Sequence, residues 1–322
     1  MRVFLIVFLL ILVLFEILIL FPKKTDQEAA AQTAAQTPNS GAPNANNQKL
    51  VEQKMQGVHL VESQKGTRDW ELFSQAAQSY QGRSEWDLEK VRILFYNNEV
   101  QDMIVRGEKG MIHSEKRDMR IEGNVEIETS NGYIFSAPYV EYSAEKRLIE
   151  CQGVVTVRGP YEGNKRTLFM RAVGMRIPVT ERKMHLDRDV RGEKIFSEGK
   201  TLDFRSDSAV LSASSQEAVL KQNVKIDYPP MKMTSQNAIF AYNEKTQDFQ
   251  YLELQGKVEL TDEKRRVVSE NLKVDIAKQE FLFSGQPRLY QGADELMGDQ
   301  IIFMDNGKKV KVEKVKAKGT LE

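Results

Sequence analysis

An alternating apolar pattern recurs six times between residues 121 and 289, and it limits what this chain can fold into. Each copy reads apolar, any residue, apolar, any residue, glycine or a polar residue, any residue, valine, any residue, apolar. The valine position falls at residues 125, 155, 190, 224 and 258, and Pro287 takes it in the last copy, so successive copies lie 29 to 35 residues apart. A period of two is typical of β-strands with one buried face, and a fixed repeat length indicates one supersecondary unit used several times. Each unit is predicted to hold two or three short strands and their turns.

The apolar residues keep the same parity through every copy, so all of them can face one side of a sheet. The glycine or polar residue in the middle of each copy predicts a β-bulge or a tight bend that curves the sheet. The sequence therefore predicts an all-β fold with an apolar inner face. The residues predicted to line this face as one groove are Ile121, Val125, Ile127, Phe135, Val155, Val157, Leu186, Val190, Leu220, Val224, Ile226, Leu254, Val258, Leu260 and Phe283.

Turn-forming sequences favour antiparallel strands over a parallel β-helix. Ser130-Asn131-Gly132 and similar polar stretches at 143–146, 243–246 and 305–307 are typical of hairpin turns. A parallel β-helix usually repeats at shorter periods and does not need such turns. The stretch from Trp70 to Tyr80 is the one place where an amphipathic helix remains an alternative to a strand.

Residues 1–21 are predicted to form a transmembrane anchor. The run from Val3 to Phe21 is apolar except for Glu16, and a helix of this length spans about 28 Å, close to the thickness of a bilayer core. A cleaved signal peptide would have a shorter apolar region followed closely by a small-residue site. Glu16 is either tolerated near the membrane interface or makes a contact with a membrane partner. Residues 22–48, rich in Ala, Gln, Thr, Pro and Asn, are predicted to be a flexible linker.

The residues show no catalytic or metal-binding pattern, so no enzymatic activity and no cofactor are expected. Lys plus Arg balance Asp plus Glu at 46 each, which gives no overall charge to attract nucleic acid. The single cysteine, Cys151, excludes an intramolecular disulfide and is expected to be a small buried residue. His59, His113 and His185 have no partner at a metal-ligand spacing and are expected at the surface.

The final strand is rich in lysine, with six lysines between residues 308 and 318 and valines between them. Lysine on an edge strand can prevent aggregation. It can also form a cationic rim that meets lipid phosphates or an acidic edge strand of a partner. Val310, Lys311, Val312 and Val315 are the residues predicted to form this partner-docking edge.

Several short motifs resemble the LptC family, which provides the membrane-anchored bridge component of lipopolysaccharide export. They are Met55-Gln56-Gly57-Val58, Trp70-Glu71-Leu72, Gly110-Met111-Ile112, Arg120-Ile121-Glu122-Gly123-Asn124-Val125, Gly132 and Tyr133-Ile134-Phe135. From about Gly192 onward, other motifs resemble the soluble bridge component LptA: Leu220-Lys221-Gln222-Asn223-Val224, Leu254-Gln255-Gly256-Lys257-Val258 and Gly298-Asp299-Gln300-Ile301. The chain is longer than a typical LptC, so residues 49–191 are identified as an LptC-like module and residues 192–322 as an LptA-like extension. No Pro- or Ser-rich linker separates them, which predicts one continuous sheet.

The resemblance implies an open antiparallel β-jellyroll whose groove binds lipopolysaccharide through the acyl chains of lipid A. It implies a single-pass inner-membrane protein with most of the chain in the periplasm, acting in outer-membrane biogenesis. The implied partners are the inner-membrane ABC transporter, LptB, LptF and LptG, and an LptA-like or LptD-like β-jellyroll protein. The alternative hypothesis is an envelope scaffold or adhesive β-repeat protein without a lipid ligand, and a membrane-tethered hydrolase is a third.

Overall fold

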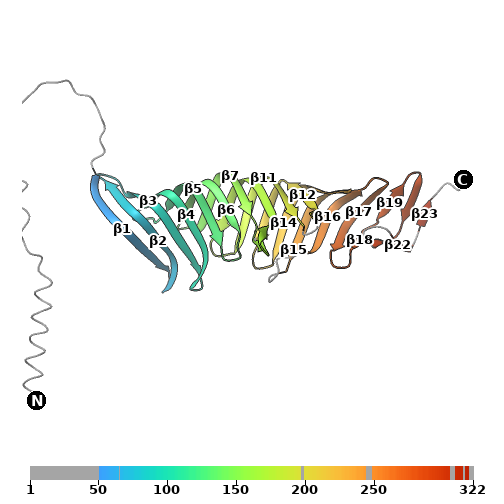
Figure 1. Ribbon diagram of the computed structural model, residues 1–322, viewed down its shortest axis with the longest axis horizontal. Helices are drawn as coiled ribbons and strands as arrows, with labels where there is room; N and C mark the ends of the chain where they lie inside the picture. Colours follow the sequence, from blue (N-terminus) through green and yellow to red (C-terminus); the bar gives the residue numbers. More distant parts are fainter. Residues whose placement is uncertain are drawn as a thin grey trace, which may run out of the picture. The chain divides into compact units, whose positions relative to one another are not determined.

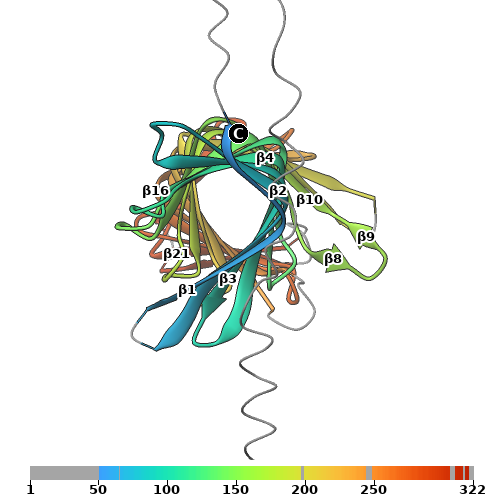
Figure 2. The same cartoon turned by 90° about the vertical axis from the view of Figure 1, so that its left-hand side faces the viewer.

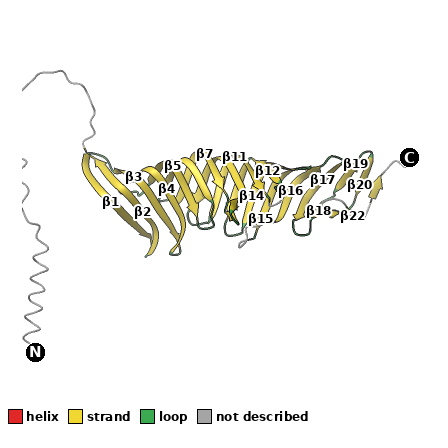
Figure 3. Cartoon of the chain, in the orientation of Figure 1, coloured by secondary structure: helices red, strands yellow, loops and turns green. Residues whose placement is uncertain are grey.

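The computed structural model describes residues 51–64, 66–196, 199–243, 249–304, 309–314 and 316–318. Contacts divide the chain into a unit of residues Met1–Gln48 and a unit of residues Lys49–Glu322, and the described residues belong to the second. The predicted anchor at 1–21 and the predicted linker at 22–48 lie outside the described residues. Within the described ranges, no helix is long and apolar enough to cross a membrane. Figure 3 shows this part of the chain as strands joined by loops.

Antiparallel strands follow one another in chain order and form one long sheet (Figure 1). The strands are β1 (Val51–Gln64), β2 (Thr67–Tyr80), β3 (Glu85–Asn97), β4 (Val100–His113), β5 (Met119–Thr129), β6 (Ile134–Ser143), β7 (Leu148–Arg158), β8 (Tyr161–Glu162), β9 (Lys165–Arg166), β10 (Leu168–Pro178), β11 (Lys183–Ile195), β12 (Thr201–Ser206), β13 (Ser208–Ser212), β14 (Glu217–Tyr228), β15 (Met231–Tyr242), β16 (Phe249–Thr261), β17 (Arg265–Asp275), β18 (Glu280–Ser284), β19 (Arg288–Gln291), β20 (Asp294–Met297), β21 (Gln300–Met304), β22 (Lys309–Glu313) and β23 (Lys316–Lys318). Only β8 and β9 form a separate two-stranded sheet within the described residues.

The strand pairing confirms the antiparallel all-β prediction. Consecutive strands pair antiparallel from β1 through β7, and β14 through β17 continue the same pattern. The turn predicted at Ser130-Asn131-Gly132 joins β5 to β6, and the turn predicted at 143–146 lies at the β6–β7 connection. The parallel β-helix is therefore excluded. The helix considered for Trp70 to Tyr80 is also wrong, because these residues lie in β2 and pair with both β1 and β3.

The long strands bend near their middle, at the positions where the sequence predicted bulges. In β5, Gly123 and Asn124 have φ angles of 80° and 48°, and the register with β6 shifts between Glu122 and Val125. In β16, Gly256 and Lys257 have φ angles of 77° and 50°, and a shift occurs there as well. A bulge with left-handed backbone re-aims the strand and increases its twist. These bends line up across neighbouring strands and form a crease that runs along the sheet.

Buried serines stabilise the crease. The hydroxyls of Ser74, Ser206, Ser235 and Ser269 each donate to the backbone carbonyl two residues further on, at 2.7 to 2.9 Å. All four serines are less than 8% exposed. A bulge leaves backbone groups without ladder partners, and a local hydroxyl can satisfy one of them.

Folding at the crease turns the sheet into two walls, and the turns gather along two edges. The first edge contains the turns at 98–99, 130–133, 159–167, 229–230 and 262–264. The second edge contains the turns at 114–118, 144–147, 179–182, 213–216 and 276–279. The two edges meet along a line that we call the seam, where Arg182 of the second edge lies 3.3 Å from Asp102 beside the first. Figure 2 shows the strands curving round a common axis.

Candidate functional site

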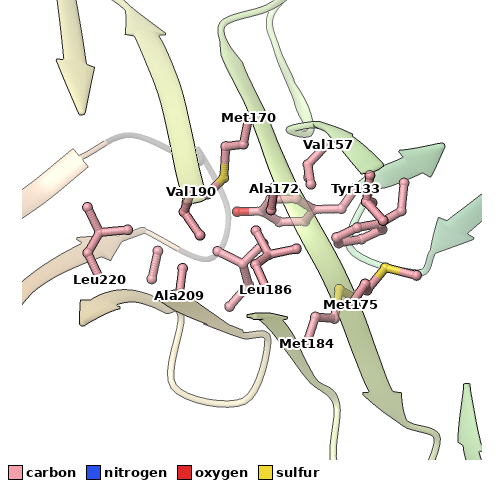
Figure 4. Packing of buried hydrophobic residues seen from close by; sticks show 14 of the residues in the cluster. Tyr133, Val157, Met170, Ala172, Met175, Met184, Leu186, Val190, Ala209 and Leu220 are labelled. Carbon is pink, nitrogen blue, oxygen red and sulfur yellow. The ribbon is translucent and has the colours of Figure 1, made fainter. Parts of the chain in front are cut away.

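The inner face of the two walls is the candidate functional site. All fifteen residues predicted to line a groove are at most 2% exposed, and all belong to one continuous buried cluster. They come from β5, β6, β7, β11, β14, β16 and β18. Figure 4 shows Val157, Leu186, Val190 and Leu220 among other apolar side chains between the strands. The structure therefore brings the predicted residues together on one face.

The intervening strands also contribute to this face, which the repeat did not identify. Leu72 in β2, Val105 in β4, Ala172 in β10, Ala238 in β15 and Leu272 in β17 are at most 1% exposed. The same cluster reaches from Trp70 to Phe303, so it spans nearly the whole described sheet. Its lining is almost wholly aliphatic and aromatic, which suits hydrocarbon and leaves few polar groups to desolvate.

A cavity of about 400 Å³ opens in the part of the seam that lies after residue 195. Pro229 and Pro230 line it from the first edge and Ile276 and Gln279 line it from the second, with Phe281 among the apolar walls. Its volume falls within the range of about 300–1,000 Å³ that is usual for ligand pockets.

The charged side chains of Asp262 and Arg265 also line this cavity. Burial opposes ionisation of Asp262, but hydrogen bonds from the Arg265 guanidinium and from backbone N–H groups outweigh it, so the pKa of Asp262 is lowered. The Arg265 guanidinium also lies 4.8 Å from the ring centre of Phe303. The cavity therefore has largely apolar walls together with one ion pair between Asp262 and Arg265.

The predicted partner-docking edge lies on β22, which pairs with β21. Val310 is 41% exposed, Lys311 is exposed and Val312 is partly buried against the core. Val315 and Glu16 lie outside the residues that the structure describes. At the other end of the sheet, β1 pairs with β2, and its residues are mostly exposed.

Cys151 and His59 lie in β7 and β1. Cys151 is buried, and burial raises the pKa of its thiol. The His59 ring lies 3.2 Å from the Glu71 carboxylate and stacks on Phe73. In the described ranges, no group of three or more His, Cys, Asp or Glu side chains could hold a metal ion.

Comparison with known proteins now places the chain. Residues 6–195 match the family model described as lipopolysaccharide-assembly, LptC-related, and residues 203–309 match the model described as LptA/(LptD N-terminal domain) LPS transport protein. No curated protein matches. Among solved structures, the chain is similar to LptH, the LptA homologous periplasmic component of the lipopolysaccharide transport device from Pseudomonas aeruginosa, with 12% identity and a TM-score of 0.34 over 37% of this chain and 95% of that chain. Because the first model covers more than half of the sequence, this chain belongs to the LptC-related family of lipopolysaccharide-assembly proteins, and an LptA-like region follows the LptC-related part.

Proposed function

We propose that this chain is a membrane-anchored periplasmic bridge that binds lipopolysaccharide through its lipid A acyl chains and passes it from the inner-membrane ABC transporter toward the outer membrane. The single observation that carries the proposal is the continuous apolar inner face, from Trp70 to Phe303, shared by the LptC-related and LptA-like regions. In this proposal, residues 49–191 form the LptC-like module and residues 192–322 form the LptA-like module.

Burial of hydrocarbon supplies the binding energy in this proposal. Each buried CH₂ contributes about 0.8 kcal/mol, so an acyl chain of ordinary length binds without any specific polar contact. Because the apolar lining changes little along the sheet, the lipid has no deep minimum in which to be trapped. The protein supplies the surface and no chemistry, in keeping with a transport component that is not an enzyme and needs no cofactor.

The packing of the inner face favours a second candidate function. The fifteen predicted groove residues pack against one another and are almost fully buried, which is what a scaffold or adhesive repeat protein without a lipid ligand would also show. In the lipid-binding proposal the two walls must move apart when acyl chains enter. The cavity of about 400 Å³ at the seam is where the walls are already separated.

Photocrosslinking in cells separates the two functions. A photoreactive phenylalanine analogue replaces Phe135 or Phe283, which are fully buried and similar to it in shape. Matched controls replace Tyr139 and Tyr290, which are only partly buried. We expect lipopolysaccharide to be captured from the two inner positions and not from the controls. Capture at neither inner position, in a protein that folds and is exported, would favour the scaffold.

Two docking edges and the anchor complete the proposal. β1 faces the transporter, LptB, LptF and LptG, and the edge formed by Val310, Lys311, Val312 and Val315 adds a strand from an LptA-like or LptD-like protein. An open sheet end presents unpaired N–H and C=O groups, which a partner strand satisfies while extending the apolar face. A truncation before Asn306 is expected to abolish binding of the next bridge protein. Normal export by the truncated chain would argue against this edge.

Glu16 is proposed to contact a membrane helix of the transporter. Replacing residues 3–21 with an unrelated spanning helix is then expected to weaken co-purification of the transporter with this chain. If co-purification does not change, the anchor acts only as a tether.

A further inference from the structure

Three arginines bridge the seam in the LptC-related half. The Arg117 Nε lies 3.6 Å from the Glu62 carboxylate, and the Arg182 Nε lies 3.3 Å from the Asp102 carboxylate. Arg147 lies between them in the sequence and forms an ion pair with Asp69. In each pair the arginine belongs to a turn of the second edge, and the carboxylate belongs to a strand end on the first edge. These contacts join residues about 55 to 80 positions apart in the chain, so they hold the two walls together.

Arg147 and Arg182 occupy one repeated position, and Arg117 lies one residue earlier in its turn. Arg117, Arg147 and Arg182 have φ angles of 61°, 51° and 50°, and each is the last or next-to-last residue of its turn. The carbonyls of Arg147 and Arg182 accept hydrogen bonds at 3.0 Å from Val179 and Ala213, which belong to the following turn. The repetition shows that the arginines are placed by the fold and not by chance surface contacts.

In the LptA-like half the same position holds glutamine. Gln216 has a φ angle of 54°, and its carbonyl accepts from the Tyr242 N–H at 3.0 Å, as the arginine carbonyls do in their turns. Its side-chain amide turns back to the carbonyl of Ala213. Gln279, with a φ angle of 53°, lines the cavity at the seam. A neutral amide cannot form an ion pair, so the LptA-like half has no arginine–carboxylate bridge at these two positions.

The Arg147 pair leaves donors that a further anion could use. Arg147 donates through Nη1 to Gln64 at 2.7 Å and through Nη2 to Asp69, while its Nε is buried without a hydrogen-bond partner. The hydroxyl of Tyr142, a residue only 4% exposed, also lacks a partner. Burial raises the pKa of Asp69, so its charge is held there at a cost that the Arg147 guanidinium offsets in part. An arginine with a partly desolvated carboxylate partner and one N–H without a hydrogen-bond partner is well suited to exchange that carboxylate.

We propose that Arg117, Arg147 and Arg182 are seam latches, and that a phosphate on a lipid headgroup opens each latch by taking the arginine from its carboxylate. Guanidinium groups bind phosphate through two parallel hydrogen bonds, as they bind carboxylate. The headgroup part of this inference rests on the proposed function, because a headgroup too large for the interior must pass along the seam. The latch itself depends only on the geometry of the seam.

The latches are weak enough to open. The side chains of Arg117 and Arg182 are more than 40% exposed, and an ion pair of this kind shifts an equilibrium by only about two- to five-fold. The two exposed pairs together are expected to lower the population with an open seam by about fourfold or more. The Arg147–Asp69 pair, which is more buried, adds to this effect. Because salt screens such pairs, with a Debye length of about 3 Å at 1 M, high salt should open the seam as well.

Distance measurements by electron paramagnetic resonance on the full chain test the latches. Spin labels are placed at Val100→Cys and Glu181→Cys, two exposed positions on opposite edges beside the third latch, with Cys151→Ala to remove the native thiol. A second labelled protein carries Glu263→Cys and Ala277→Cys across the seam of the LptA-like half. The test variant combines Arg117→Gln, Arg147→Gln and Arg182→Gln. The control is Arg158→Gln, whose ion pair with Glu126 at 2.6 Å lies within one wall.

In the native protein we expect a short distance with a narrow distribution between residues 100 and 181. This distance should become longer in the triple variant and stay unchanged in the control. The distance between 263 and 277 should not respond, which also shows that the triple variant remains folded. Adding purified lipopolysaccharide should lengthen the first distance, and dephosphorylated lipopolysaccharide should not. An unchanged first distance in the triple variant would overturn the latch, and equal opening by both lipids would overturn the phosphate exchange. If the triple variant opens but the inner-face photocrosslinks capture no lipid, the latch stands and the proposed function fails.

Discussion

Lys194 and Glu162 give the sharpest test of how the structure is stabilised near the junction of its two halves. Lys194, in β11, is 2% exposed. Its ammonium pairs with the Glu162 carboxylate and donates to the Thr167 hydroxyl at 2.8 Å, and it lies 5.5 Å from the centre of the Phe249 ring. Glu162 belongs to the β8–β9 hairpin, which projects beside the main sheet (Figure 2). The pair therefore joins the hairpin to the seam.

The two partners differ in exposure, so their removal should cost different amounts. Glu162→Gln leaves an ammonium whose side chain is 3% exposed without a counter-charge, and a buried charge that loses its partner costs about 3–5 kcal/mol. Lys194→Met replaces the charge with an apolar chain of similar length, while the Glu162 side chain, already 22% exposed, can turn into water. That replacement should cost about 1 kcal/mol or less. The double variant should resemble Lys194→Met, since it leaves no buried charge.

Urea unfolding, followed by far-UV circular dichroism, measures the three variants in a double-mutant cycle. The expected order of midpoints places Glu162→Gln lowest, with the other two variants close to the native protein. Amide hydrogen exchange in β8 and β9 adds a local measurement, because the hairpin can open before the sheet unfolds. If Lys194→Met is as destabilised as Glu162→Gln, the asymmetry argument is wrong and the lysine contributes mainly through its contacts with Thr167 and Phe249.

Three further predictions concern pH, packing and the sheet end. Burial, followed by repulsion from Arg176, lowers the pKa of His185 below 6.5. The unfolded chain therefore binds more protons than the folded one, and stability is lost as the pH falls below about 6.5. The decrease in Tm between about pH 7.5 and about pH 5.5 should be smaller in His185→Asn. Gly192→Ala would place Cβ 2.7 Å from the Phe169 carbonyl oxygen, and overpacking of this kind should lower the free energy of unfolding by about 1–3 kcal/mol in a urea titration. Val312→Pro removes one backbone donor from β22. If that donor faces the docking edge, the change should weaken binding of a partner bridge protein in a pull-down while the Tm stays within a few degrees of the native value.

The strands that the sequence repeat identified and the strands that it missed differ in one quantity. The spacing of the buried residues on either side of the crease is longer by one residue in the identified strands. In β5 and β16 the buried residues flanking the crease are four apart, Ile121 with Val125 and Leu254 with Val258, so parity is kept and the repeat is visible. In β17 they are three apart, Ser269 and Leu272, and the parity changes there. The register explains the difference. Gln255 and Val258 of β16 are three residues apart, whereas their partners in β17, Asn271 and Ser269, are two residues apart.

The seam could not be predicted from the sequence, since it depends on closure of the two walls. Arg147 and Asp69 are far apart in the chain, and nothing in their local sequence relates them. Strand pairing also decided the ambiguous stretch from Trp70 to Tyr80, which has alanines and buried aromatic residues that suit either conformation. Its position between β1 and β3 gives most of its residues strand partners on both sides.

The junction between the two family matches is built from strand pairing and not from a linker. β11 contains the end of the LptC-related match at residue 195, and it pairs with β12 and β13, which lie at the start of the LptA-like match. Gly192 of β11 contacts the Phe204 ring of β12 so closely that a side chain at this position would displace the ring or the backbone. A hinge there would break a ladder of six paired residues, from Val190 with Ser206 to Ile195 with Thr201. The apolar face therefore crosses the boundary at a fixed register. Under the proposed function, a lipid that moves between the halves would not have to wait for two proteins to dock.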